Sequence, residues 1–137
     1  LLVFDARRAG AEEPRALDLG IDADVEAVTL LPGGRRALAG VDGALRLVDL
    51  ETGAARELAR DLSLYALAVS PDGRLAATGA STGRADALVL DVETGERLAS
   101  LGGQRGYLLG LAFSPDGRTL VTCGTDGRIL AHAVPGR

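Results

Sequence analysis

A tetrapeptide that recurs at a fixed distance constrains the fold of this chain more than any other feature. Ser70-Pro71-Asp72-Gly73 is repeated as Ser114-Pro115-Asp116-Gly117, 44 residues later. A looser copy, Leu31-Pro32-Gly33-Gly34, lies 39 residues before the first. Proline presets φ at the second position of a tight turn, and glycine tolerates positive φ at its end. Self-similarity at such a period indicates a chain built from successive copies of one unit of about 40 residues.

Short apolar segments on both sides of each turn have the length of β-strands. The segments before the turns are 25–31, 65–69 and 108–113, and those after them are 36–39, 75–78 and 119–123. A third segment follows in every unit, at 44–50, 87–92 and 128–134, and a fourth follows in two units, at 55–59 and 97–101. An Asp-Gly turn precedes the third segment in two units, whereas the middle unit has the longer loop 81–86. Asp-Gly between apolar runs indicates a hairpin, and no periodic stretch is long enough for a helix. The sequence therefore predicts an all-β fold of four-stranded antiparallel units.

The order of these features resembles the WD40 family of β-propellers, in which each repeat forms one four-stranded blade. Phe4-Asp5, Val48-Asp49 and Leu90-Asp91 stand where the family has Trp-Asp. The resemblance covers the whole chain and implies a partial propeller of about three to three and a half blades, similar to degenerate bacterial repeats. His132 takes the Trp position in the last unit, and no unit has the Gly-His that precedes the first strand in the family. We therefore expect the family's buried His–Ser/Thr–Asp–Trp hydrogen-bond set to form in no blade.

The strand count predicts that the chain is part of a ring. We assign 1–19 to the third and fourth strands of a first blade, 25–59 to a second blade, 64–101 to a third, and 107–134 to the first three strands of a last blade. These 13 strands compare with about 28 in a ring of seven four-stranded blades. We expect the chain to be the C-terminal part of the propeller of a larger bacterial protein. The alternative is a homodimer in which two copies complete one ring.

Composition narrows the classes of function. The net charge of −4 argues against a nucleic-acid surface, which needs a basic patch. A single Cys and a single His leave no clustered zinc ligands, and no apolar run reaches the roughly 18 residues of a membrane span. All 15 basic residues are arginine, which together with the many Ala and Gly residues suggests a GC-rich genome. Without a visible targeting segment, we expect a cytoplasmic protein.

The residues that resemble catalytic or metal-binding groups have simpler structural interpretations. Ser81 lies in a G-x-S-x-G match, but that motif needs a helix after it, and the segment that follows reads as a strand. His132 and Cys123 lie in predicted strands and are interpreted as packing residues, Cys123 as a small buried hydrophobe. The aspartates of the turns lack the D-x-D-x-D-G spacing of calcium loops and are interpreted as turn residues. We therefore expect no catalytic residue, metal or cofactor, and no enzymatic activity.

A partner surface is predicted where the loops before the first strands meet the loops between second and third strands, a face that binds peptides and proteins in many WD40 propellers. The candidate contacts are Tyr65, Arg84, Arg105 and Tyr107, because exposed Tyr and Arg often anchor interfaces. The alternative for the two tyrosines is that they line the inner core. The predicted function is a non-catalytic scaffold or sensor that binds a protein, a peptide or another domain of its own polypeptide. The alternative is a lactonase-like or dehydrogenase-like propeller enzyme, or a small-molecule binder, whose site residues lie mostly in further blades.

Overall fold

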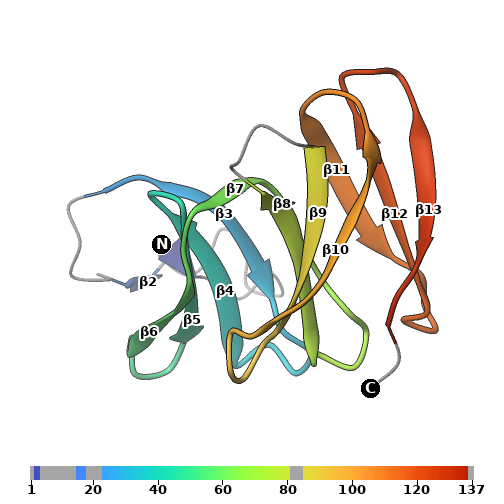
Figure 1. Cartoon of the computed structure of the whole chain (residues 1–137). Helices are drawn as coiled ribbons and strands as arrows, with labels where there is room; N and C mark the ends of the chain where they lie inside the picture. The colour runs from blue at the N-terminus through green and yellow to red at the C-terminus, as the bar shows by residue number, and fades with distance from the viewer. Residues whose placement is uncertain (1, 4–14, 18–22, 81–84, 136–137) are drawn as a thin grey trace, which may run out of the picture.

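Four antiparallel sheets make up the computed structural model of the chain, which describes residues 2–3, 15–17, 23–80 and 85–135 (Figure 1). β1 (Leu2–Val3) pairs with β2 (Arg15–Ala16). The next sheet contains β3 (Val25–Leu30), β4 (Arg36–Val41), β5 (Ala44–Asp49) and β6 (Ala55–Ala59), in that order. It is followed by the sheet of β7 (Leu62–Val69), β8 (Leu75–Ala80), β9 (Ala85–Asp91) and β10 (Arg97–Gln104), and by that of β11 (Leu108–Phe113), β12 (Thr119–Gly124) and β13 (Ile129–Ala133). The predicted all-β class with four-stranded antiparallel units is confirmed.

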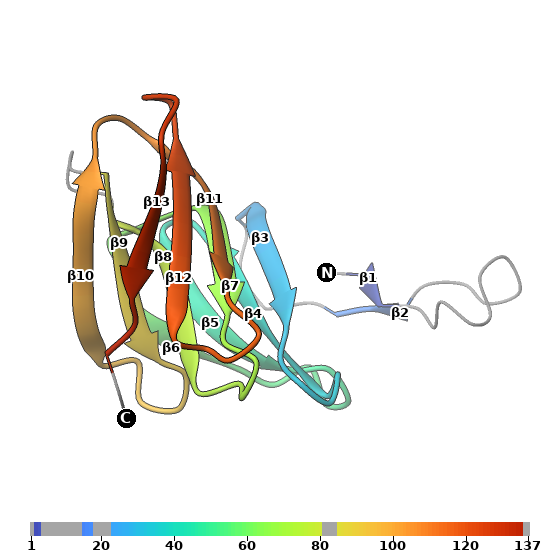
Figure 2. The ribbon, with the colours of Figure 1, turned by 90° about the vertical axis from the view of Figure 1, so that its right-hand side faces the viewer.

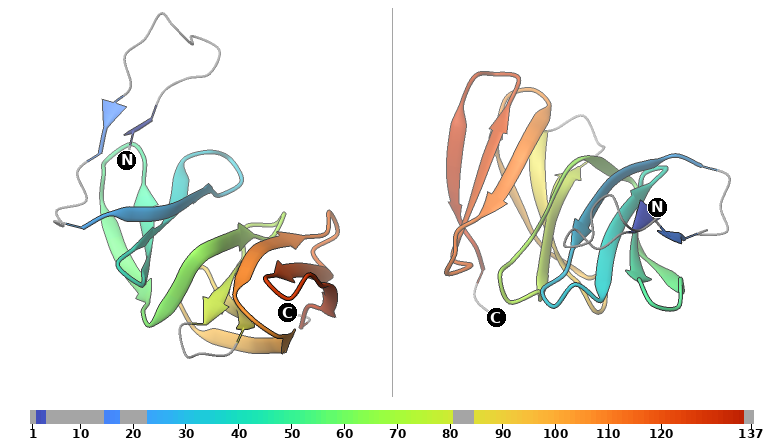
Figure 3. Two further views of the ribbon diagram at one scale, coloured as in Figure 1. Left: turned by 90° about the horizontal axis from the view of Figure 1, so that it is seen from above. Right: turned by 180° about the vertical axis from the view of Figure 1, so that it is seen from behind.

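The three larger sheets follow one another around an arc, as blades do. Their first strands, β3, β7 and β11, are neighbours, whereas the fourth strands β6 and β10 lie farther apart (Figure 3, left). In Figure 2 the β11–β13 sheet faces the viewer, with the β7–β10 sheet behind it. This arrangement is that of a partial propeller.

Apolar side chains fill the space between successive sheets. Leu38 and Leu45 pack with Leu64 and Leu90 between the β3–β6 and β7–β10 sheets. Between the β7–β10 and β11–β13 sheets, Leu120 is fully buried in a second cluster. Full burial of one leucine side chain contributes about 1.5–3 kcal/mol. The strands β4 and β8 are buried almost throughout, because both of their faces are covered.

The two Ser-Pro-Asp-Gly turns are built alike. Ser70 Oγ donates a 2.6 Å hydrogen bond to Asp72 Oδ1, which also accepts one from the backbone N of Arg74. Asp116 receives the same two bonds in the second copy. The serine hydroxyl first, and then the backbone N–H, lowers the pKa of each aspartate. These carboxylates therefore bond locally, as the turn interpretation predicts.

The boundaries of the longer strands agree with those predicted to within two residues, except at two places. β7 starts at Leu62 rather than near Tyr65, and β10 continues to Gln104, although the glycine-rich stretch 102–106 reads as a loop. A register shift between Leu101 and Gln104 admits Gly103 at φ +113°. Glycine can adopt this conformation inside a bulged strand, and sequence alone does not distinguish such a bulge from a loop.

Candidate functional site

The candidate site is one end of the sheets, which we call the loop face; it lies at the upper end in Figure 1. The backbone N of Leu62 donates to the carbonyl of Gly43 at 3.0 Å, which joins the β6–β7 connection to the β4–β5 turn. In the last sheet the backbone N of Tyr107 donates to Thr125 Oγ1, also at 3.0 Å. The loops before first strands and those after second strands therefore meet, as the sequence predicts.

Tyr65 and Tyr107 are both exposed, with 83% and 79% of their surface accessible. Tyr65 belongs to β7, and Tyr107 directly precedes the neighbouring strand β11. Neither ring is part of the core, so the inner-core alternative does not hold. Arg105 is also exposed and its backbone N donates to Asp126 Oδ2 at 2.8 Å, whereas Arg84 lies outside the described residues. Leu109 of β11, which follows closely after Tyr107 in the sequence, is also exposed and adds apolar surface.

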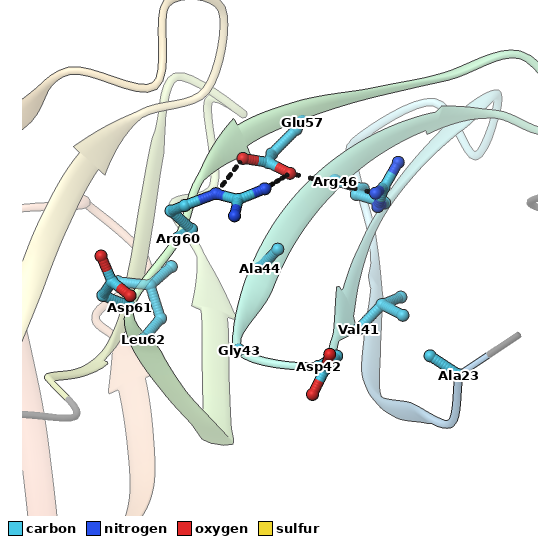
Figure 4. A pocket seen from close by; sticks show the side chains of 10 residues that line it. All are labelled: Ala23, Val41, Asp42, Gly43, Ala44, Arg46, Glu57, Arg60, Asp61 and Leu62. Atoms are coloured by element: carbon cyan, nitrogen blue, oxygen red, sulfur yellow. Dashed lines mark hydrogen bonds and ion pairs between the residues drawn. The ribbon is translucent and has the colours of Figure 1, made fainter. Parts of the chain in front are cut away.

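A pocket of about 400 Å³ opens on the same face, between the β4–β5 turn and the β6–β7 connection (Figure 4). Its charged lining residues are Asp42, Arg46, Glu57, Arg60 and Asp61. Glu57 lies between the two arginines and accepts hydrogen bonds from Arg60 Nε and Nη2 at 2.7 and 2.6 Å. These bonds are the main reason why the pKa of Glu57 is lowered and that of Arg60 is raised.

A polar set of four side chains joins β10 to the last sheet. Gln104 Nε2 donates to Asp126 Oδ1 at 2.6 Å, and Gln104 Oε1 accepts a 2.9 Å hydrogen bond from Thr122 Oγ1. Thr122 Oγ1 in turn lies 3.2 Å from His132 Nε2. The backbone N of Arg105 is the first cause of the lowered pKa of Asp126, and Gln104 contributes as well. These hydrogen bonds hold the β10–β11 connection against the β12–β13 turn.

This polar set refines an expectation from the sequence: the family's own His–Ser/Thr–Asp–Trp set does not form, because the sequence has no Trp. Gln104 stands before β11 where the family has His, and His132 stands at the Trp position. A hydrogen-bond set of the family's kind therefore does form in the last sheet, with two of its four members substituted. Among the described residues of the β7–β10 sheet, only part of such a set is seen: Thr78 donates to the carbonyl of Ser63, and the Trp position holds the buried Leu90. Sequence reasoning missed Gln104, because it was placed in a loop.

Of the other candidate residues, the structure describes His132 and Cys123. The segment after the G-x-S-x-G match is the strand β9, not a helix, and Ser81 itself lies outside the described residues. Cys123 is half-buried rather than fully buried, and His132 is half-buried as expected. In the described ranges no three His, Cys, Asp or Glu side chains are grouped as a metal site requires. The same ranges contain no helix with the length and hydrophobicity of a membrane span.

Comparison with known protein families supports the assignment of a WD40 repeat. Residues 95–130 match the family model described as WD domain, G-beta repeat. The matched segment contains β10, β11 and β12 and ends in β13, and it includes Gln104, Thr122 and Asp126 of the polar set. A search of curated proteins finds no match to the chain. The repeat match and the recurring antiparallel sheets together show that the chain contains a WD40 repeat within a partial propeller.

Proposed function

We propose that this chain is a non-catalytic propeller segment whose loop face binds a protein or a peptide. The observation that carries the proposal is the pair of exposed tyrosines in a chain with a WD40 repeat, Tyr65 on the first strand β7 and Tyr107 directly before the neighbouring first strand β11. A tyrosine ring offers a large contact area and a polar hydroxyl at little entropic cost, so such residues often dominate binding energies. The partner is a separate protein or another domain of the same polypeptide. The bacterial origin and the cytoplasmic setting stay predictions from the sequence.

Peptide selection followed by substitution tests the proposal. Random peptides are selected on the wild-type protein, and their affinities are then measured by calorimetry for Tyr65→Ala and Tyr107→Ala. We expect each substitution to weaken binding by about tenfold, as truncation of an interface anchor does. The control is Arg118→Ala, an exposed residue after the Ser-Pro-Asp-Gly turn at the opposite end of the β11–β13 sheet.

Undiminished affinity in both tyrosine variants would show that the loop face is not the contact surface. A metal present in stoichiometric amount in the purified protein would instead favour the enzymatic alternative, since propeller enzymes of that kind use metal or acidic ligands near the central axis.

A further inference from the structure

One charged side chain in the loop-face pocket lacks the partners that its burial requires. Arg46 lies on β5 and its side chain is 23% exposed. Its Nε atom is buried and has no hydrogen-bond partner among the residues that the structure describes. Glu57 Oε2 lies 3.9 Å from Arg46 Nη2, which is an ion-pair distance but too long for a hydrogen bond. A guanidinium has five N–H donors, and leaving a buried donor unsatisfied is costly.

The strand register explains why Arg46 is left without an acceptor. Arg46 is paired with Ala39 on β4 and with Glu57 on β6, so the only charged side chain directly across from it is that of Glu57. Arg60 takes both carboxylate oxygens of Glu57 at hydrogen-bond distance. Ala39 offers no polar atom in its side chain. The pocket therefore contains one arginine that is hydrogen-bonded to Glu57 and one, Arg46, that reaches Glu57 only at ion-pair distance (Figure 4).

The charges around the pocket restrict what can bind to Arg46. Its lining has two arginines and three acidic residues, Asp42, Glu57 and Asp61, a formal net charge of −1. A phosphate group would bring about −1.5 to −2 charges close to these carboxylates. A carboxylate brings one charge, and its two oxygens match the planar fork of a guanidinium. The pocket thus suits a single carboxylate better than a phosphate or a run of acidic residues.

We propose that this pocket is a carboxylate subsite, in which Arg46 binds one carboxylate group of the partner polypeptide. The inference rests on the proposed function, because the β4–β5 turn and the β6–β7 connection that form the pocket belong to the loop face. It adds that the partner presents an isolated carboxylate, from a Glu or Asp side chain or from a chain end, with neutral or basic neighbours that tolerate Asp42 and Asp61.

The test observes Arg46 directly in the wild-type protein. The ¹⁵N–¹H signal of the Arg46 Nε–H group is followed by NMR, after its assignment with Arg46→Lys. The probes are acetyl-Gly-Glu-Gly-amide, acetyl-Gly-Gly-Gly with a free C-terminus, acetyl-Gly-Gln-Gly-amide and inorganic phosphate. We expect a saturable shift with the first or the second probe, which identifies the source of the carboxylate. The glutamine peptide should give none, and phosphate should bind more weakly.

The variant Arg46→Met provides two further measurements, which are expected to move in different directions: probe affinity should fall, whereas stability should not. The substitution should weaken binding of the carboxylate probe by at least about tenfold, the loss of affinity expected when a charge-assisted hydrogen bond disappears. Without a probe it should leave the urea midpoint unchanged or raise it, because an unsatisfied buried charge is removed. The control is Arg56→Met, an exposed β6 arginine outside the pocket, which should keep the affinity for the probe.

Equal shifts with the glutamate and glutamine peptides, or tighter binding of phosphate, would overturn the carboxylate subsite. Selected peptides that need Tyr65 and Tyr107 but bind Arg46→Met with full affinity would also overturn it, while the proposed function stands. A carboxylate probe that binds at Arg46 when no selected peptide depends on the tyrosines would support the subsite and refute the tyrosine contact surface.

Discussion

Replacing Thr122 by valine removes the hydroxyl at the centre of the polar set while nearly preserving the shape of the side chain. Thr122 is 1% exposed, and its hydroxyl donates to Gln104 Oε1 at 2.9 Å. The same oxygen lies 3.2 Å from His132 Nε2. The valine variant loses both contacts and leaves the buried Gln104 Oε1 without its donor.

The neighbouring sheet offers a matched control for the size of the stability loss. Thr78 occupies the same place in β8 and is fully buried, and its hydroxyl donates one hydrogen bond to the carbonyl of Ser63. A net hydrogen bond contributes about 1 kcal/mol, and orphaning a buried polar group costs about 1–3 kcal/mol. We therefore expect Thr122→Val to lower the free energy of unfolding by about 2–3 kcal/mol and Thr78→Val by about 1 kcal/mol.

Urea denaturation followed by far-UV circular dichroism measures this difference, since the chain has no Trp for fluorescence. With a slope of about 2 kcal/mol per molar urea, the midpoint should fall by about 1–1.5 M for Thr122→Val and by about 0.5 M for Thr78→Val. Unchanged slopes would show that the denatured states are comparable.

The reasoning would be refuted if Thr122→Val lost no more unfolding free energy than Thr78→Val. That result would mean that the contacts of Thr122 to Gln104 and His132 contribute nothing to stability. A double-mutant cycle with His132→Leu sharpens the result. Leucine is the residue that the β7–β10 sheet has at this position, Leu90. The two substitutions should be non-additive by about 0.5 kcal/mol or more if Thr122 and His132 interact.

Two further predictions concern the turns. Gly95→Ala should be strongly destabilising in thermal unfolding, because its Cβ would clash with the backbone carbonyl of Leu58. Gly53→Ala has a similar positive φ, but the nearest atom to its Cβ would be Leu17 Cδ2 at 3.8 Å, so it should cost only about 1–2 kcal/mol. Equal losses of stability would exclude the close approach as the cause. The lowered pKa values of Asp72 and Asp116 predict a stabilising contribution that is complete above pH 3.8 and is lost as the pH falls below it. Urea midpoints measured between neutral pH and about pH 2 should fall less steeply when both residues are changed to asparagine, and an unaltered acid profile would contradict this assignment.

The sequence by itself determines the strands and the turns of this protein. The Ser-Pro-Asp-Gly turns close through bonds between residues two to five apart, such as Ser70 Oγ to the Asp72 carboxylate and to the backbone N of Leu75. Such contacts depend only on nearby residue types, so their repetition reveals both the strand length and the period. The antiparallel pairing across each turn follows from the same local chemistry.

Only the tertiary structure decides which side chains meet across the sheets. Gln104 joins the polar set because a glycine bulge extends β10 until it reaches the β12–β13 turn, 22 residues away in the chain. Arg46 lacks an acceptor because the register of β5 and β6 gives it Glu57 as a neighbour while Arg60 takes that carboxylate. Composition and spacing cannot supply these results, since the register, the bulges and the competition for one partner are settled when the sheets pack together.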